Sequence, residues 1–128
     1  MNKAYEFLGR EDGIRALVDR FYDLMDTLPD AGAIRAMHPP DLSESRDKLY
    51  FFLVGRFGGP PLYTDRFGHP RLRGRHMPFA VDTRAAEAWL LCMDTALDEQ
   101  VDPGPERDEL SAFFRQVAMF MRNRPDQV

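Results

Sequence analysis

Hydrophobic side chains recur at helical spacing in the first quarter of the chain. Between Ile14 and Met25 they return every three or four positions, whereas Arg15 and Asp19 fall on the opposite face. A helix with one apolar and one polar face has this periodicity. The pattern therefore predicts an amphipathic helix over residues 11–27.

A short helix and a second long helix are expected next. Residues 31–37 predict the short helix, which has to stop before Pro39 because a proline excludes the helical conformation in the residue before it. Residues 43–57 place their apolar side chains on one face, which predicts the long helix. Asp41 or Ser43 can cap its first turn.

Two more helices are expected in the last third of the chain. Asp82 or Thr83 can cap the first of them, and a run of Pro and Gly ends it. Acidic side chains from Glu106 onward favour the start of the second helix, because they interact with the positive end of its macrodipole. Residues 110–121 carry its apolar stripe.

The segment 60–79 between these helices is rich in Gly, Pro and Arg, so regular structure is not expected over most of it. No stretch of the chain alternates as a strand would, and the predicted fold class is all-α. A loop of about 20 residues is uncommon in a compact domain and is usually functional. This one contains Tyr63, His69, His76 and four arginines, which suits an anionic, metal-containing cofactor such as haem.

Composition narrows the function. With 128 residues, 44% of them hydrophobic, the chain is expected to fold as one domain over 1–128 with an ordered core at about 5–122. A net charge of -4 gives no general attraction to nucleic acid. The single cysteine, Cys92, and the lack of an apolar N-terminal run favour a reducing cytoplasm. No apolar stretch approaches the roughly 20 residues that cross a bilayer.

Haem places four demands on a protein: an axial nitrogen ligand, an apolar slot, groups that hold its propionates, and a distal pocket. His76 lies just before Met77-Pro78-Phe79, where a brief helical turn can aim the imidazole at iron. A histidine in an arginine-rich loop is by itself more often a surface residue. The assignment therefore depends on the neighbouring sequence.

The segment around His76 carries the most specific motif. Residues 68–79 read Gly-His-Pro-Arg-Leu-Arg-Gly-Arg-His-Met-Pro-Phe, which resembles the proximal signature of the group II truncated haemoglobins. Further matches run in the family's order from about residue 5 to residue 120: Arg20-Phe21-Tyr22, Gly58-Gly59-Pro60, Ala88-Trp89-Leu90 and Cys92-Met93. The resemblance implies a globin-like fold of two helices over two, a haem b cofactor (iron protoporphyrin IX), and His76 as the iron ligand.

The resemblance also implies a polar distal pocket, the side of the haem where ligands bind. Tyr22 and Trp89 match a tyrosine and a tryptophan that donate hydrogen bonds to the ligand. His38 stands where many members of the family have a tyrosine. Histidine titrates near neutral pH, so a pH-dependent ligand affinity is expected. Taken alone, Tyr22 and Trp89 also fit core aromatics, and His38 fits a turn residue.

Other residues are expected to line the cofactor. Ser45 and Leu49 match positions of the distal helix that face the iron. The expected apolar walls are Phe52, Leu53, Phe79 and Met93, and the expected propionate contacts are Lys48, Tyr63, His69 and Arg75. Each of the four propionate candidates fits a solvated side chain equally well.

These expectations describe a haem protein for oxygen binding or transport that takes dioxygen, nitric oxide, carbon monoxide or similar ligands, as a monomer or weak dimer. Nitric oxide dioxygenation or peroxide reduction with an external reductase is left open. One alternative is a cofactor-free helical module that binds a partner protein. Another is a non-haem metal site of His38, His69 and His76, which lack the close spacing typical of zinc sites.

Overall fold

The computed structural model describes residues 3–71, 74, 76–77 and 79–125, and the regular elements within these residues are helical. In chain order they are α1 (Ala4–Phe7), α2 (Arg10–Thr27), the 3-10 helix η1 (Pro29–Ala31), α3 (Gly32–Ala36), α4 (Ser43–Arg56), α5 (Leu62–Phe67), α7 (Thr83–Gln100) and α8 (Pro105–Phe120). The all-α prediction is confirmed.

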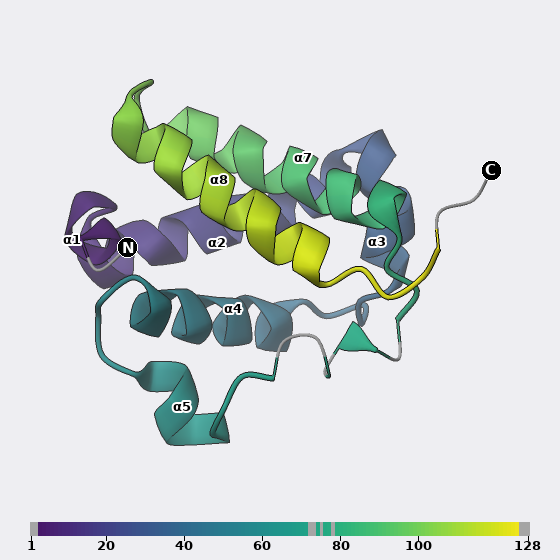
Figure 1. Cartoon of the computed structure of the whole chain (residues 1–128), viewed down its shortest axis with the longest axis horizontal. Coiled ribbons are helices and arrows are strands. Elements are labelled where there is room, and N and C mark those ends of the chain that lie inside the picture. The colour runs from purple at the N-terminus through teal and green to yellow at the C-terminus, as the bar shows by residue number, and fades with distance from the viewer. Residues whose placement is uncertain (1–2, 72–73, 75, 78, 126–128) are drawn as a thin grey trace.

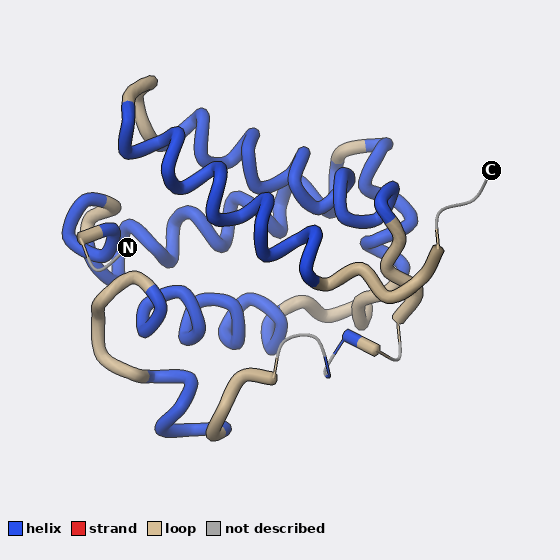
Figure 2. The backbone as a smooth tube through the Cα atoms, viewed as in Figure 1, coloured by secondary structure: helices blue, strands red, loops and turns tan. Residues whose placement is uncertain are grey.

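Four long helices form two packed pairs. α2 packs against both α4 and α7, and α8 packs against α7. Figure 1 shows α4 along one side of the molecule, α7 and α8 along the other, and α2 between them. In Figure 2 each of these four helices runs without interruption. The expected arrangement of two helices over two is confirmed.

A chain of aromatic rings joins the four long helices inside the core. The Phe21 ring of α2 lies 5.0 Å from the Trp89 ring of α7, between ring centroids. Trp89 lies 6.0 Å from Phe114 of α8, and Phe114 lies 6.0 Å from Phe57, which ends α4. Phe21, Phe57 and Phe114 are almost completely buried. Aromatic side chains bury large apolar areas, so these contacts tie the helices together.

The boundaries of the long helices agree well with the hydrophobic pattern. The carboxylate of Asp82 accepts a hydrogen bond of 2.9 Å from the Ala85 N–H, so the expected cap of α7 is confirmed. The expected cap of α4 is wrong. Leu42 occupies the capping position, and Asp41 instead accepts from the backbone N–H and the hydroxyl of Ser43. These local bonds form a turn ahead of the helix.

The sequence pattern missed two short helices. α5 lies inside segment 60–79, where irregular structure was expected. Pro61 precedes its first turn, and Gly68, with a φ of 75°, ends it. The Tyr63 ring of α5 packs 6.4 Å from Phe52 of α4. A helix of six residues, between a proline and a glycine, is too short to show a clear hydrophobic periodicity. α1 has only four residues and was missed for the same reason.

α1 folds closely back onto α2. At Gly13, on the first turns of α2, an added Cβ atom would overlap the backbone carbonyl of Leu8. Only glycine allows the two backbones to approach so closely. Among the described helices, none is both long and apolar enough to cross a membrane.

Candidate functional site

Tyr22 projects from α2 toward the turn that carries His38. Its side chain is buried, with 6% of its surface exposed. Its ring lies 4.8 Å from the Phe21 ring and 6.0 Å from the His38 ring, both in edge-to-face geometry. Two of the predicted distal residues therefore lie side by side, although 16 positions separate them in the sequence.

The Tyr22 hydroxyl is an available hydrogen-bond donor. Within the described residues it has no hydrogen-bond partner. Every side-chain oxygen or nitrogen that is fully enclosed in this part of the chain does have such a partner, so the Tyr22 oxygen is not fully enclosed. The hydroxyl therefore opens onto accessible space. Burial raises the pKa of the phenol, and the nearby positive charge of Arg46 opposes this rise only in part. The phenol keeps its proton at neutral pH.

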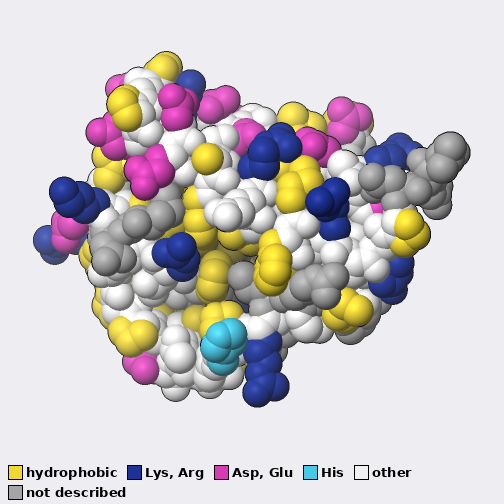
Figure 3. Space-filling model, in the orientation of Figure 1, with side chains coloured by type: hydrophobic (Ala, Val, Ile, Leu, Met, Phe, Trp, Pro, Cys, Tyr) yellow, Lys and Arg dark blue, Asp and Glu magenta, His cyan; other side chains and the backbone are white. Residues whose placement is uncertain are grey.

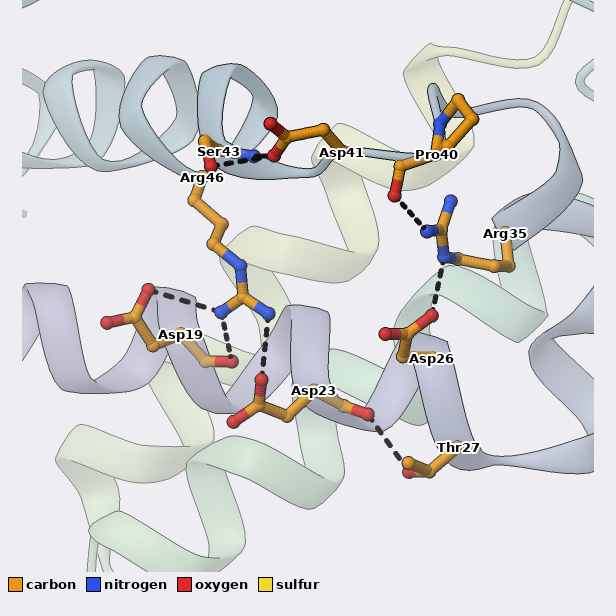
Figure 4. A network of polar contacts seen from close by, with 9 residues as sticks. All are labelled: Asp19, Asp23, Asp26, Thr27, Arg35, Pro40, Asp41, Ser43 and Arg46. Atoms are coloured by element: carbon orange, nitrogen blue, oxygen red, sulfur yellow. Dashed lines mark hydrogen bonds and ion pairs between the residues drawn. The ribbon is translucent and has the colours of Figure 1, made fainter.

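Arg46 of α4 reaches across to Asp19 and Asp23 of α2 and ties the two helices together (Figure 4). Its guanidinium donates to the Asp23 carboxylate at 2.7 Å and to the backbone carbonyl of Asp19 at 3.0 Å. A longer bond of 3.3 Å reaches the Asp19 carboxylate. The guanidinium carbon also lies 5.8 Å from the centroid of the Tyr22 ring. One side chain thus fixes the distance between the two helices and places a positive charge near the phenol.

His38 has a defined proton position. Its Nδ1 lies 2.8 Å from the carbonyl oxygen of Ile34, which can only accept, so Nδ1 carries the hydrogen. Burial lowers the pKa of His38, and the charges of Arg35 and His76 lower it further, whereas the bond to Ile34 opposes them. The neutral ring therefore presents a bare Nε2.

Arg35 holds the turn that positions His38. Its guanidinium donates to the Asp26 carboxylate at 2.7 Å and to the carbonyl oxygens of Pro39 and Pro40 at 2.9 Å. Figure 4 shows the guanidinium between Asp26, near the end of α2, and Pro40. Because Pro39 and Pro40 end the short helix, their carbonyl groups are open to this side chain.

Trp89 lies half-buried between the Phe21 and Phe114 rings. Within the described residues its indole N–H has no hydrogen-bond partner. The structure thus brings Trp89 next to Phe21, whose neighbour in sequence is Tyr22. The predicted distal set of Tyr22, His38 and Trp89 comes from three different elements.

His76 lies in a single turn of helix, as the sequence suggested. The Met77 N–H donates to the Gly74 carbonyl at 3.3 Å, and the Phe79 N–H donates to the His76 carbonyl at 2.9 Å. His76 is exposed, and so are Met77 (45%) and Phe79 (41%). Exposed apolar side chains gathered around one histidine are typical of a surface that binds a ligand or a partner protein.

An apolar hollow lies on the face shown in Figure 3, between α8 and α4. The expected walls are half-buried or buried: Leu49 and Phe52 partly, Leu53 and Met93 almost fully. An apolar hollow, the imidazole of His76 and two hydrogen-bond donors, Tyr22 and Trp89, that have no partner among the described residues match what haem requires. The residues present therefore fit this cofactor.

Two of the expected propionate contacts lie close together, because the Lys48 ammonium lies 5.3 Å from the Phe67 ring centroid and the Tyr63 ring packs against the same ring. Lys48 pairs with Glu44 at 2.9 Å. Tyr63 is buried between aromatic rings, at 4.9 Å from Phe67. His69 is exposed and accepts a bond from the Arg71 N–H within its own turn. Arg75 lies outside the described residues, and Ser45 is half-buried on α4.

Comparison with known proteins decides the family. The family model of the bacterial-like globins matches residues 3–123. The group 2 truncated hemoglobin YjbI of Bacillus subtilis is 38% identical over 125 residues, which cover 98% of this chain and 92% of that protein. This chain belongs to the bacterial-like globins, as a group II truncated haemoglobin.

Two solved structures of such globins superpose closely on this one. The cold-adapted truncated hemoglobin of Pseudoalteromonas haloplanktis TAC125 is 42% identical, with a TM-score of 0.91, over 94% of this chain and 97% of that chain. The group II 2-on-2 hemoglobin of Agrobacterium tumefaciens is 43% identical, with a TM-score of 0.90, over 95% and 94%. Membership of the globins implies haem and small gaseous ligands.

The non-haem alternative gains no support from the globin structure. Among the residues that the structure describes, no three His, Cys, Asp or Glu side chains converge as a metal site would require. His69 in particular engages its own turn.

Sequence reasoning missed two residues of this globin, Arg46 and Asn123. Asp19 and Asp23 lie four positions apart on one face of α2, which signals a shared cationic partner, but the pattern does not identify it as Arg46. The second, Asn123, donates from its side-chain amide to the backbone carbonyl of His76. No local pattern signals that contact.

We expect Arg46→Met to lower the free energy of unfolding by about 1–2 kcal/mol, because hydrogen bonds to charged groups are worth more when the pair is partly shielded from water. The Arg46 side chain is 23% exposed. Urea unfolding of the purified protein measures the change. Arg10→Met is the matched control, since Arg10 and Glu6 form an exposed pair; a loss below about 0.5 kcal/mol is expected. Equal losses in the two variants would contradict this tie between α4 and α2.

Proposed function

We propose that this globin binds haem b through His76 and takes up dioxygen, nitric oxide or carbon monoxide. The observation that carries the proposal is the Tyr22 hydroxyl, a donor in a buried side chain that has no hydrogen-bond partner within the described part of the chain. Its ring packs edge-to-face against His38, a second expected distal residue. An iron porphyrin bound there supplies a metal centre that takes a diatomic ligand.

The distal side chains would hold the ligand by hydrogen bonds. Tyr22 offers an O–H and Trp89 an N–H, and both face no competing acceptor among the described residues. A hydrogen bond to a group that carries charge is worth about 1.5–3 kcal/mol. At about 1.4 kcal/mol per tenfold, one such donor slows ligand loss about ten- to a hundredfold.

The remaining predicted residues would enclose the cofactor. Ser45, Leu49, Phe52, Leu53, Phe79 and Met93 would line its faces, and Lys48, Tyr63, His69 and Arg75 would meet its propionates. Lys48 would have to exchange its pair with Glu44 for a propionate. This exchange costs little because exposed ion pairs are weak. The expected redox activities with an external reductase, the cytoplasmic location and the state of monomer or weak dimer stay predictions.

We expect the purified protein to take up haemin and show the absorption bands of a haem protein, and His76→Ala to lose them. Thr64→Ala, an exposed change on α5, is the control and should take up haemin normally. Titration of each apoprotein with haemin, followed by absorption, measures this. No uptake by the unmodified protein would refute the proposal and favour the cofactor-free module.

Tyr22→Phe is expected to speed oxygen dissociation about ten- to a hundredfold, because it removes only the donating hydroxyl. Stopped-flow mixing with an oxygen scavenger gives the rate. Tyr50→Phe is the matched control; Tyr50 is half-buried on α4 beside Phe51 and should leave the rate unchanged within about twofold. Equal rates in the two variants would show that Tyr22 is a core aromatic and not a distal donor.

Ligand dissociation is expected to slow as the pH falls below the ordinary histidine range of about 6.5. Since Nδ1 already donates to Ile34, only the protonated ring can also donate from Nε2. Burial and the charge of Arg35 lower the pKa of His38, so this donor appears only in acid. The Tyr22 ring is its neighbour on α2, and that phenol stays protonated throughout. His38→Phe should abolish the acid limb of the rate profile; an unchanged profile would contradict this role.

A further inference from the structure

The turn that follows α8 pairs with the segment that precedes α7. The Asn123 N–H donates to the Val81 carbonyl at 2.7 Å, and the Arg124 N–H donates to the same oxygen at 3.2 Å. In return, the Val81 N–H donates to the side-chain oxygen of Asn123 at 2.9 Å. Figure 1 shows the yellow end of the chain crossing this segment. These bonds hold the segment at Val81, which precedes α7, against the turn at residues 123–124, which follows α8.

The Asn123 carboxamide has a second partner, the backbone of His76. Its Nδ2 donates to the His76 carbonyl at 3.0 Å, while its oxygen accepts from Val81. The orientation of the amide is thus fixed by its partners, because an N–H can only donate and a carbonyl can only accept. One side chain bridges two backbone groups that lie five positions apart.

The His76 carbonyl has both of its acceptor sites in use. Phe79 donates to it from within the same turn, and Asn123 donates to it from 47 positions away. An isolated helical turn of this length is unstable because its few internal bonds do not offset the loss of conformational entropy. An external bond therefore limits how far the His76 backbone, and with it the imidazole, can rotate.

We propose that Asn123 is a positioning residue, whose carboxamide holds the His76 backbone against the turn after α8 and so sets the direction of the proximal imidazole. This inference rests on the proposed role of His76 as the iron ligand. It makes the turn after α8 a part of the cofactor site, because Asn123 contacts the backbone of the proposed iron ligand.

Two variants separate the two bonds of the amide. Asn123→Ala removes both. Asn123→Asp retains the acceptor for Val81 but sets a carboxylate oxygen against the His76 carbonyl, and Arg124, which donates to the same side-chain oxygen at 3.2 Å, keeps that carboxylate ionised. Ser111→Ala is the matched control, because Ser111 donates to Asp94 and so bridges α8 and α7 without contacting His76.

Transfer of haem to an excess of a scavenging apoglobin measures how firmly each variant holds the cofactor. One hydrogen bond is worth about 0.5–1.5 kcal/mol, so Asn123→Ala should speed haem loss about 2- to 10-fold. Asn123→Asp should speed it at least as much. Both should shift or broaden the iron–histidine stretching band in the Raman spectrum. Ser111→Ala should lower the melting temperature of the apoprotein yet leave haem loss and the band unchanged.

Amide hydrogen exchange tests the same inference in the unmodified protein. Haem binding should slow exchange at Val81 and Asn123 several-fold, because a ligand that requires the held conformation stabilises the bonds that hold it. Unchanged exchange, or normal haem loss and an unshifted band in both Asn123 variants, would overturn the positioning role alone. Failure of the unmodified protein to take up haemin would instead refute the proposed function, and this inference with it.

Discussion

The contact between Phe21 and Trp89 is the constraint on which the site depends. It belongs to the aromatic chain that joins α2, α7, α8 and the end of α4. Successive side chains of a helix point about 100° apart, so fixing Phe21 in the core also fixes where Tyr22 points. The same contact holds the Trp89 ring. Both proposed distal donors therefore take their positions from one packing interaction.

The sequence predicted the long helices because each of them buries one continuous face. Helices of 14 to 18 residues are long enough for their periodicity to be recognised, and the Asp82 cap added a local signal at the start of α7. α5 was missed because its stability comes from packing of Tyr63 against Phe52, a contact between separate elements. Local propensity alone, between Pro61 and Gly68, indicated a loop.

The same distinction applies to the site. Tyr22, Trp89 and His76 were recognised because the sequence around them resembles that of the group II truncated haemoglobins, whereas each residue taken alone also fits a core aromatic or a surface histidine. The partners that hold them were not recognised, because Arg46 and Asn123 act across 23–27 and 42–47 positions respectively. Only the folded chain shows that a single arginine meets two aspartates, or that an asparagine near the end of the chain reaches the His76 backbone.

The two sides of the site are held by different kinds of interaction, and the difference suits what each side does. Arg46 has only donors, so it approaches Tyr22 without taking up the phenol hydrogen and leaves that hydrogen available. An acceptor at the same place would have satisfied the hydroxyl and removed the distal donor. At His76 the holding bond goes to the backbone carbonyl from the neutral Asn123 amide, which adds no charge beside the imidazole. The proposed distal donor Tyr22 thus lies beside a cation that leaves its hydrogen free, and the backbone of the proposed proximal ligand is held by a neutral group.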